Sequence, residues 1–470
     1  MSTSKELVVT LGLAMTSAAG WSAPPTPEEA AFHDVYKQLV EIDTTLSSGS
    51  CTEAAHAMAT RLKSSGIADE DLQVIVPPDS PTQGNLVAIL HGTDPSAKAI
   101  LLLAHIDVVE ANRADWERDP FTLIEEDGYF YGRGTADDKA MAAIFVDALM
   151  RYQQEGYRPE RSVKLALTCG EETPYNFNGV EYLLAHHREL VDAEFALNEG
   201  GGGKLDGDGR RIFNGVLAGE KIYQDLRLEI TNPGGHSSRP QKDNAVYRLA
   251  AALARLSSFV FPVELNDTTR AFFDRMSRIE TGQTAADMRA ILATPPAADA
   301  LARISDDPSY NAILRTTCVA TMLDGGHAPN ALPQRAGANV NCRILPGHTQ
   351  EEIRQTLENV VADPGISVAF VDPPESVSPP PVLTREILAP IEALTEQMWP
   401  GVPVLPIMQA GATDARFLTP AGIPTYGVSG LFSDATTSNA HGLNERMRVQ
   451  SLYEGRRFLD GLIRSYAGGK

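Results

Sequence analysis

The chain has 470 residues, more than one hydrophobic core usually fills, so we expect two domains. Hydrophobic residues make up 43% of the chain and charged residues 21%, which is typical of a globular protein and not of a disordered or membrane-embedded one. The 61 Asp and Glu outnumber the 40 Lys and Arg, which gives a formal net charge of −21. This excess argues against nucleic acid as a partner, because phosphate binding requires a basic surface.

The first 23 residues have the layout of a secretory signal. Lys5 precedes an apolar run over residues 7–15, and small residues follow at 16–19. The run is too short to span a bilayer, and no other segment of the sequence reaches that length. We therefore expect removal of residues 1–23 and export to the periplasm or the medium. The alternative is a frayed terminus on a cytoplasmic protein.

Residues 24–220 alternate between helical and strand patterns after a proline-rich start. Helices are predicted at Glu28–Val40, Thr52–Ser65, Ala136–Gln154 and Gly179–His187, and strands at Leu72–Val76, Asn85–His91, Ala99–Ala104, Val163–Thr168 and Ala193–Leu197. Continuous apolar strands suit a sheet that is covered on both faces. The alternation predicts an α/β catalytic domain with a mixed sheet. Residues 201–211 are predicted to form a surface loop.

Residues 221–372 follow a different order, strand-helix-strand-strand-helix-strand, which is typical of a ferredoxin-like α+β domain. The predicted elements are Ile222–Ile230, Asn244–Leu256, Thr316–Leu323, Ala336–Ile344, Thr349–Val361 and Ile366–Phe370. Residues 262–309 interrupt this domain with a mostly helical, polar insertion. Residues 373–470 return to the α/β pattern. The domain at 221–372 is therefore predicted to be inserted into a discontinuous α/β domain.

The four cysteines do not have the spacing of a zinc ribbon or a redox motif. Cys169 follows an apolar strand, so we expect a buried, unreactive thiol there. Cys318 and Cys342 are equidistant from Asn330. If their strands are antiparallel neighbours, the two thiols meet, and an oxidising compartment would permit a disulfide.

Five short segments carry imidazoles and carboxylates, and several of them follow predicted strands. They are His105-Ile106-Asp107, the Gly-rich turn at residues 132–138, Gly170-Glu171-Glu172, Asn198-Glu199-Gly200 and His441-Gly442. In α/β sheets, chemistry gathers beyond the carboxyl ends of the strands. A site for two metal ions needs such ligands from several strand ends and loops. The pattern predicts a zinc-type amide hydrolase.

These segments, with Gly235-His236-Ser237-Ser238, resemble the M20 family of metallopeptidases, which includes carboxypeptidases, dipeptidases, aminoacylases and related deacylases. The resemblance covers nearly all of the chain after the signal segment. It implies that His105 and Glu199 bind one ion, that Glu172 and His441 bind the other, and that Asp137 bridges the two. Mixed nitrogen and oxygen ligands suit two Zn²⁺ per chain, with Co²⁺ or Mn²⁺ as substitutes.

The resemblance also assigns roles beside the metal ligands. Glu171 is the expected general base, which takes a proton from water and passes it to the leaving nitrogen. Apolar surroundings and a nearby carboxylate would raise its pKa towards neutrality. Asp107 is expected to hold the second ring nitrogen of His105. Arg133 and Lys139 are interpreted as structural.

Further residues are expected to contact the substrate. The resemblance implies that His236 hydrogen-bonds the scissile carbonyl, often from a partner subunit, and stabilises the oxyanion. Asn330 and Arg343 match positions that hold a free carboxylate, for which a guanidinium is well suited. Thr413 and Arg416 lie in another similar segment, where a substrate role and a structural role are equally open.

The sequence therefore predicts a dinuclear zinc hydrolase that cleaves an amide next to a free carboxylate. The resemblance also implies that the inserted domain is a lid or dimerisation domain, so that His236 reaches the site either in a homodimer or through a large domain closure. Exopeptidase action on small peptides is the first expectation, and deacylation of N-acyl amino acids is the alternative. A non-catalytic binding protein is a remote alternative, because every expected ligand and the base are present. A two-metal phosphoesterase would want a more basic pocket than the sequence supplies.

Overall fold

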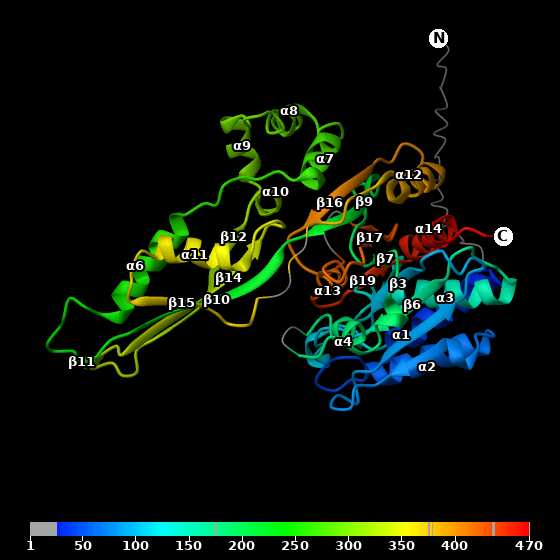
Figure 1. The fold of residues 1–470 in the computed structure, drawn as a ribbon, viewed down its shortest axis with the longest axis horizontal. Helices are drawn as coiled ribbons and strands as arrows, with labels where there is room; N and C mark the ends of the chain where they lie inside the picture. Colours follow the sequence, from blue (N-terminus) through cyan, green and yellow to red (C-terminus); the bar gives the residue numbers. More distant parts are fainter. Residues whose placement is uncertain (1–25, 174–175, 375–376, 378, 435–437, 470) are drawn as a thin grey trace, which may run out of the picture.

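The computed structural model describes residues 26–173, 176–374, 377, 379–434 and 438–469 (Figure 1). The predicted signal segment lies outside these residues. The chain forms an α/β body and an elongated second domain that extends away from it (Figure 1). None of the described helices is long and apolar enough to cross a bilayer.

The α/β body is built on a ten-stranded mixed sheet in the order β1-β2-β6-β3-β7-β17-β9-β8-β18, with β16 also paired to β9. Neighbours β6, β3, β7 and β17 run parallel, whereas β2 runs antiparallel to β6. The strand bounds are β1 Leu72–Ile75, β2 Asn85–Leu90, β3 Ile100–His105, β6 Val163–Thr168, β7 Phe195–Asn198, β8 Gly202–Leu205, β9 Arg211–Glu220, β16 Val404–Gln409, β17 Thr425–Gly427 and β18 Phe432–Ser433. Parallel central strands place several carboxyl ends at one edge.

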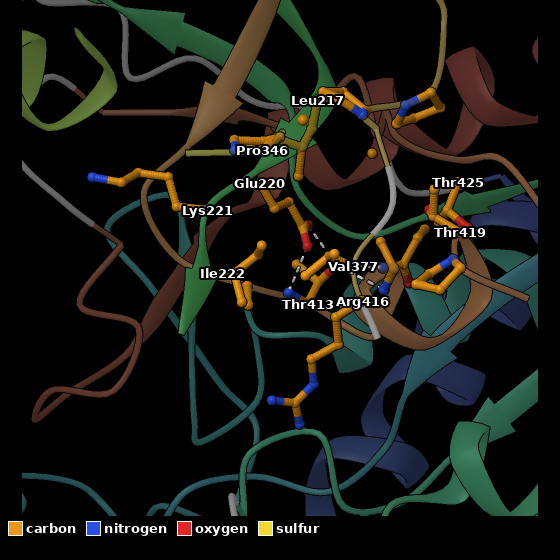
Figure 2. Close-up of a pocket in the computed structure, with 18 of the residues that line it drawn as sticks. Leu217, Glu220, Lys221, Ile222, Pro346, Val377, Thr413, Arg416, Thr419 and Thr425 are labelled. Atoms are coloured by element: carbon orange, nitrogen blue, oxygen red, sulfur yellow. Dashed lines mark hydrogen bonds between the residues drawn. The ribbon is translucent and has the colours of Figure 1, made fainter. Parts of the chain in front are cut away.

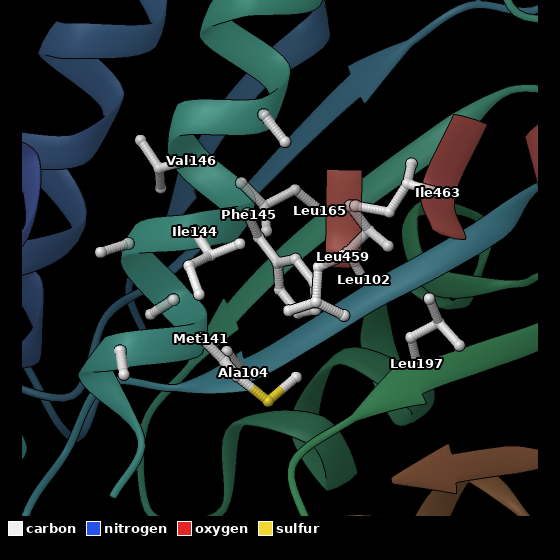
Figure 3. Close-up of a cluster of buried hydrophobic side chains, with 14 of the residues drawn as sticks. Leu102, Ala104, Met141, Ile144, Phe145, Val146, Leu165, Leu197, Leu459 and Ile463 are labelled. Atoms are coloured by element: carbon white, nitrogen blue, oxygen red, sulfur yellow. The ribbon is translucent and has the colours of Figure 1, made fainter. Parts of the chain in front are cut away.

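Helices cover both faces of this sheet, as the continuous apolar strands predict. On one face, α3 packs its apolar side chains against β3, β6 and α14, as Met141, Phe145 and Leu459 show (Figure 3). A second apolar cluster fills the other face, under α4 and α13. The helices of the body are α1 Pro27–Glu41, α2 Cys51–Ser64, α3 Lys139–Glu155, α4 Gly179–His186, α5 Arg188–Val191, α12 Arg385–Met398, α13 Ala415–Leu418 and α14 Val449–Ala467. A small sheet of β4 Ile124–Glu126, β5 Tyr129–Tyr131 and β19 Arg446–Arg448 lies beside them.

The second domain, called the lid below, is a four-stranded antiparallel sheet in the order β12-β14-β10-β15. Its helices α6 and α11 share one buried apolar cluster with the sheet. The bounds are β10 Ile222–Thr231, α6 Ala245–Ser258, β12 Thr317–Gly325, β14 Arg335–Ile344, α11 Gln350–Val361 and β15 Ile366–Phe370. This is the ferredoxin-like arrangement that the chain order predicts. Two short strands, β11 Gly235–His236 and β13 Ala331–Leu332, pair with each other at the end of the lid that is far from the catalytic body (Figure 1).

The predicted insertion is helical, but it does not pack on the lid alone. Its helices are α7 Asp267–Met276, α8 Gly282–Ala290, α9 Ala298–Ser305 and α10 Pro308–Leu314. Phe273 and Met276 share an apolar cluster with Leu405 and Met408 of β16. The insertion therefore joins the lid to the catalytic body.

All four cysteines form disulfides, so the expectation of a free thiol at Cys169 is wrong. Cys169 follows β6 and is bonded to Cys51 at the start of α2, across a sequence separation of 118 residues. Helix α2 packs on β2, the neighbour of β6, which brings the two residues together. Cys318 and Cys342 also form a disulfide, and they are register partners on the antiparallel strands β12 and β14.

The predicted loop at residues 201–211 is partly wrong. Residues 202–205 form β8, which pairs with β9 and with β18 inside the large sheet. Glycine conceals this strand in the sequence, because it lacks the apolar side chains that mark a strand. Only the tip between Leu205 and Arg211 is a turn.

Candidate metal centre

The candidate metal ligands lie where three parallel strands end. Strand β3 ends at His105, β7 ends just before Glu199, and β6 is followed after a short turn by Glu172. The turn needs glycine at position 170, where φ is +94° and a Cβ would lie 2.0 Å from the main-chain oxygen of Phe177. The sheet topology thus gathers ligands that are distant in the sequence.

The first cluster consists of His105, Asp137 and Glu199. Nε2 of His105 lies 3.1 Å from Oδ1 of Asp137 and 3.8 Å from Oε1 of Glu199. The imidazole is almost fully buried, and the two carboxylates are partly buried. These three ligand atoms lie within 4.8 Å of one another, and they are the set that the family resemblance implies for the first ion.

The second cluster consists of His441, Glu172 and the same Asp137. Nε2 of His441 lies 2.8 Å from Oε1 of Glu172 and 3.3 Å from Oδ2 of Asp137. Asp137 therefore presents one oxygen to each histidine. One carboxylate can bridge two metal ions about 3.5–4 Å apart in this way. The neighbouring Asp138 belongs to neither cluster among the described residues.

Asp107 orients the site, although not entirely as predicted. Nδ1 of His105 donates to the main-chain oxygen of Asp107 at 3.0 Å, whereas the Asp107 carboxylate is 3.7 Å away. Because a carbonyl oxygen only accepts, Nδ1 carries the proton and Nε2 keeps its lone pair for a metal. The carboxylate of Asp107 instead accepts from the main-chain N–H groups of Glu171 and Glu172, at 3.3 and 3.0 Å. Asp107 thus positions both neighbouring segments.

Glu445 holds the main chain at Asp137, and no motif in the sequence predicts this contact. Its carboxylate is buried and accepts from the main-chain N–H groups of Ala136 and Asp137, at 2.7 and 3.1 Å. It also accepts from Arg133 at 2.8 Å. This pairing supports the structural interpretation of Arg133. Lys139 is likewise structural, since its ammonium donates to the main-chain oxygen of Ile42 at 2.8 Å.

The electrostatics of the site fit two divalent cations. Burial raises the pKa of Glu199 to about 7, and the nearby Asp137 adds to the rise. Burial also opposes ionisation of Asp137, but hydrogen bonds from His105 and His441 hold its pKa below the ordinary range. Divalent cations between these carboxylates and imidazoles would compensate the negative charge and favour the ionised carboxylates. Imidazole and carboxylate donors in two sets that share one member are suited to zinc-type ions.

Glu171 lies beside the candidate ligands but belongs to neither of the two clusters that have Asp137 in common. It is also close enough to His105 and Glu172 to form a third possible ligand group. Burial, followed by the charge of Glu199, raises the pKa of Glu171 to about 10. The direction agrees with the predicted general base, and bound cations would lower the value. Its position favours proton transfer at the metal site.

The structure does not bring His236 to the metal ligands of the same chain. His236 lies in β11, at the end of the lid furthest from the catalytic body (Figure 1). It is exposed, and its Nδ1 lies 2.7 Å from the hydroxyl of Ser238. Asn330 is its neighbour, since its main-chain oxygen accepts from Ser237 at 3.0 Å. Both predicted substrate residues therefore stand together at the tip of the lid.

Arg343 lies on β14, near the junction between the catalytic body and the lid, because it is the register partner of Tyr223 at the start of β10. This junction, at residues 220–222, is called the hinge below. Its guanidinium stacks over the ring of Tyr223 at 4.5 Å, and its Nε donates to Asn341 at 3.3 Å. Tyr223 in turn lines a cavity that reaches the candidate metal ligand Glu199. Arg343 thus contacts one of the residues that line this cavity.

The cavity beside Glu199 carries the other two predicted substrate residues. Its polar side is formed by Glu220, Thr413 and Arg416 (Figure 2). Thr413 is buried and hydrogen-bonded within the protein, so its contacts support a structural role. The rest of the wall is largely apolar, and it includes Leu217, Ile222, Pro346, Val377, Pro379, Pro380, Pro381 and Pro420.

The fold and the site define a hydrolase of the metal-dependent class that acts on amide bonds. Residues 101–465 match the model of the Peptidase family M20/M25/M40, and the chain belongs to this family. The resemblance in the sequence motifs is thereby confirmed.

The similarity to known proteins covers most of the chain. It is 30% identical to the human N-fatty-acyl-amino acid synthase/hydrolase PM20D1 over 388 residues, covering 80% of this chain and 76% of that protein. The M20 family metallo-carboxypeptidase Sso-CP2 from Sulfolobus solfataricus has a similar fold, with a TM-score of 0.69, 18% identity and coverage of 93% and 99% of the two chains. The YXEP protein of Bacillus subtilis, described as a dinuclear metal binding peptidase, aligns with a TM-score of 0.57, 12% identity and coverage of 92% and 97%.

Proposed function

We propose that this protein hydrolyses N-acyl amino acids with an apolar acyl group, using two zinc ions. The observation that carries the proposal is the cavity beside Glu199, whose wall is mostly apolar and rich in proline. The similarity to an N-fatty-acyl-amino acid synthase/hydrolase supports the same substrate class. Exopeptidase action, the first expectation from the sequence, becomes the second candidate, favoured by the peptidase family of the chain.

The residues of the chain divide the work of amide hydrolysis. Two zinc ions held by the clusters would supply Lewis acidity, which polarises the carbonyl and lowers the pKa of water. Glu171 accepts the proton of the attacking water and delivers it to the leaving nitrogen. Asp107 keeps Glu171 and His105 in place through its two kinds of hydrogen bond.

Recognition of the substrate is split between the two domains. Leu217, Ile222 and the proline walls offer apolar surface for an acyl chain next to the metal ligand Glu199. We propose that Arg343, which stacks on the cavity residue Tyr223, binds the carboxylate of the amino acid. An amide with one apolar and one anionic end therefore fits this site.

A panel of substrates tests the proposal. We expect kcat/KM for N-acyl amino acids to rise about threefold to fourfold per added methylene, because each buried CH₂ contributes about 0.8 kcal/mol. The rise should stop once the cavity is filled, and a chelator should abolish all release. Dipeptides and C-terminally amidated substrates are the controls. Faster cleavage of dipeptides than of every N-acyl amino acid would favour the exopeptidase instead.

We also propose that the protein forms a homodimer through the lid. Strand β12 is an edge strand, and its side chains Val319, Met322 and Leu323 are 60%, 69% and 70% exposed. Tyr247 on the adjacent α6 is 70% exposed. An exposed apolar edge strand can pair with the same strand of a second copy. A two-fold axis between the copies would make this interface self-complementary.

Charged substitutions in this edge should dissociate the dimer. We expect Leu323→Lys combined with Tyr247→Lys to give a monomer, because two lysines would face their symmetry mates without a counter-charge. Val260→Lys is the matched control, since Val260 is 62% exposed but lies beyond the other end of α6. Light scattering after size-exclusion chromatography measures the mass. A monomeric wild-type protein would remove the proposal.

We propose that the protein is exported. The two disulfides support this, because such bonds persist mainly in oxidising compartments. The signal-like layout at residues 1–23 gives the same indication. Cell fractionation with mass spectrometry of the mature N-terminus tests it. Recovery of full-length chain from the cytoplasm alone would contradict export.

A further inference from the structure

Glu220 is a buried carboxylate at the point where the chain leaves the catalytic body for the lid. It is the last residue of β9, and β10 of the lid begins two residues later. Thr413 donates to it twice, from its main-chain N–H at 3.0 Å and from its hydroxyl at 2.7 Å (Figure 2). Burial raises the pKa of Glu220 to about 6, so these two bonds help to keep it ionised at neutral pH.

Thr413 carries this contact on to the metal site. Its hydroxyl oxygen also accepts from the side-chain amide of Asn198 at 3.1 Å. Asn198 is the last residue of β7 and directly precedes the metal ligand Glu199. A chain of two hydrogen bonds therefore joins the hinge carboxylate to the strand end that presents this ligand.

The next residue, Lys221, is held from the other side of the hinge. Its buried ammonium donates to the main-chain oxygens of Ala312 and Arg315, each at 2.8 Å, and to the hydroxyl of Thr317 at 3.0 Å. These acceptors belong to the end of the insertion and to the start of β12. Adjacent residues are thus fixed to opposite domains, and the junction between them cannot shift without straining both sets of bonds.

We infer that Glu220 is a positioning residue that links the lid hinge to the metal ligand Glu199 through Thr413 and Asn198. The inference rests on the proposed function only for its kinetic consequence. A carboxylate is costly to bury, and two donors from one residue hold it in a single orientation. The geometry at Glu199 therefore depends on a residue that belongs to none of the candidate ligand groups.

Metal affinity tests the inference without any substrate. In a His441→Ala background, of the two ligand sets that share Asp137 only that of His105, Asp137 and Glu199 is complete, so a zinc titration against a chromophoric chelator reports on that set. We expect Glu220→Gln to weaken zinc binding there about tenfold, because a hydrogen bond to a charged group contributes roughly 1.5–3 kcal/mol. In a His105→Ala background, which leaves the other histidine and Glu172, the same substitution should change affinity less than twofold.

Two further variants separate positioning from general damage. Thr413→Val keeps the volume but removes the hydroxyl, and it should reproduce the site-selective loss. Glu454→Gln is the matched control, since Glu454 is also largely buried and accepts from Trp399 at 3.1 Å within the catalytic body. It should leave both affinities unchanged. Equal weakening in both backgrounds, or no weakening by Glu220→Gln, would overturn the inference.

Kinetics of the enzyme with both histidines intact provide a second readout. Glu220→Gln should lower kcat about tenfold while KM changes less than threefold, since both carboxylate oxygens of Glu220 already accept from Thr413. A larger change in KM than in kcat would make Glu220 a binding residue and overturn its positioning role. If the unsubstituted protein binds two zinc ions but cleaves no amide, the proposed function fails, whereas the metal titrations still decide the role of Glu220.

Discussion

Replacing Glu171 with Gln should reduce kcat by about two to four orders of magnitude, the usual contribution of a positioned general base. The amide keeps the size of the side chain but cannot accept a proton. Because Glu171 lies outside the two clusters that share Asp137, the variant should still bind two metal ions per chain. Measured turnover together with elemental analysis of the purified variant checks both parts.

Glu172→Gln is the matched control for this prediction. Glu172 lies 2.8 Å from His441 inside the second cluster, so its substitution should lower metal content as well as turnover. The two neighbouring glutamates would then have separable roles. Loss of metal in Glu171→Gln, with metal retained in Glu172→Gln, would mean that the base and the ligand are exchanged.

The sequence predicted that His105, Glu172 and Glu199 would lie close together because they belong to short motifs at strand ends. His105, Glu172 and Glu199 each follow an apolar strand, and parallel neighbours place such ends together. His441 has no such local signal, and only the resemblance to the family identified it. Its position next to Asp137 and Glu172 agrees with that assignment.

The contacts that sequence reasoning missed join residues far apart in the chain without any motif. Cys51 and Cys169 meet because α2 packs on β2, and β2 is the neighbour of β6, the strand that Cys169 follows. Glu445 reaches the turn before Asp137 across 308 positions, and Glu220 reaches Thr413 across 193. A buried carboxylate looks like a solvated one in the sequence, since charge alone does not reveal burial.

The structure also limits how His236 can act. Arg275 of the insertion donates to the main-chain oxygen of Val404 at 2.6 Å, and Thr268 donates to that of Ala218 at 3.4 Å. With the apolar cluster around Phe273, these contacts fix the lid to the catalytic body. Rotation of the lid onto its own metal site would break all of them. We therefore expect His236 to serve the metal site of a partner subunit.

His236→Ala should lower kcat by about two to three orders of magnitude, as does loss of other oxyanion donors. Co-expression of equal amounts of His236→Ala and Glu171→Gln chains distinguishes the two geometries. In a mixed dimer with exchange between subunits, one site combines an intact Glu171 with an intact His236 of the partner.

Random pairing makes half of the dimers mixed, so activity should recover to about one quarter of the wild-type value. If each histidine served its own chain, every site would lack one of the two groups, and the mixture would stay inactive. The result is independent of substrate identity, because it depends only on which chains complete a site. An inactive mixture of stable mixed dimers would show that the lid closes on its own chain despite the contacts of the insertion.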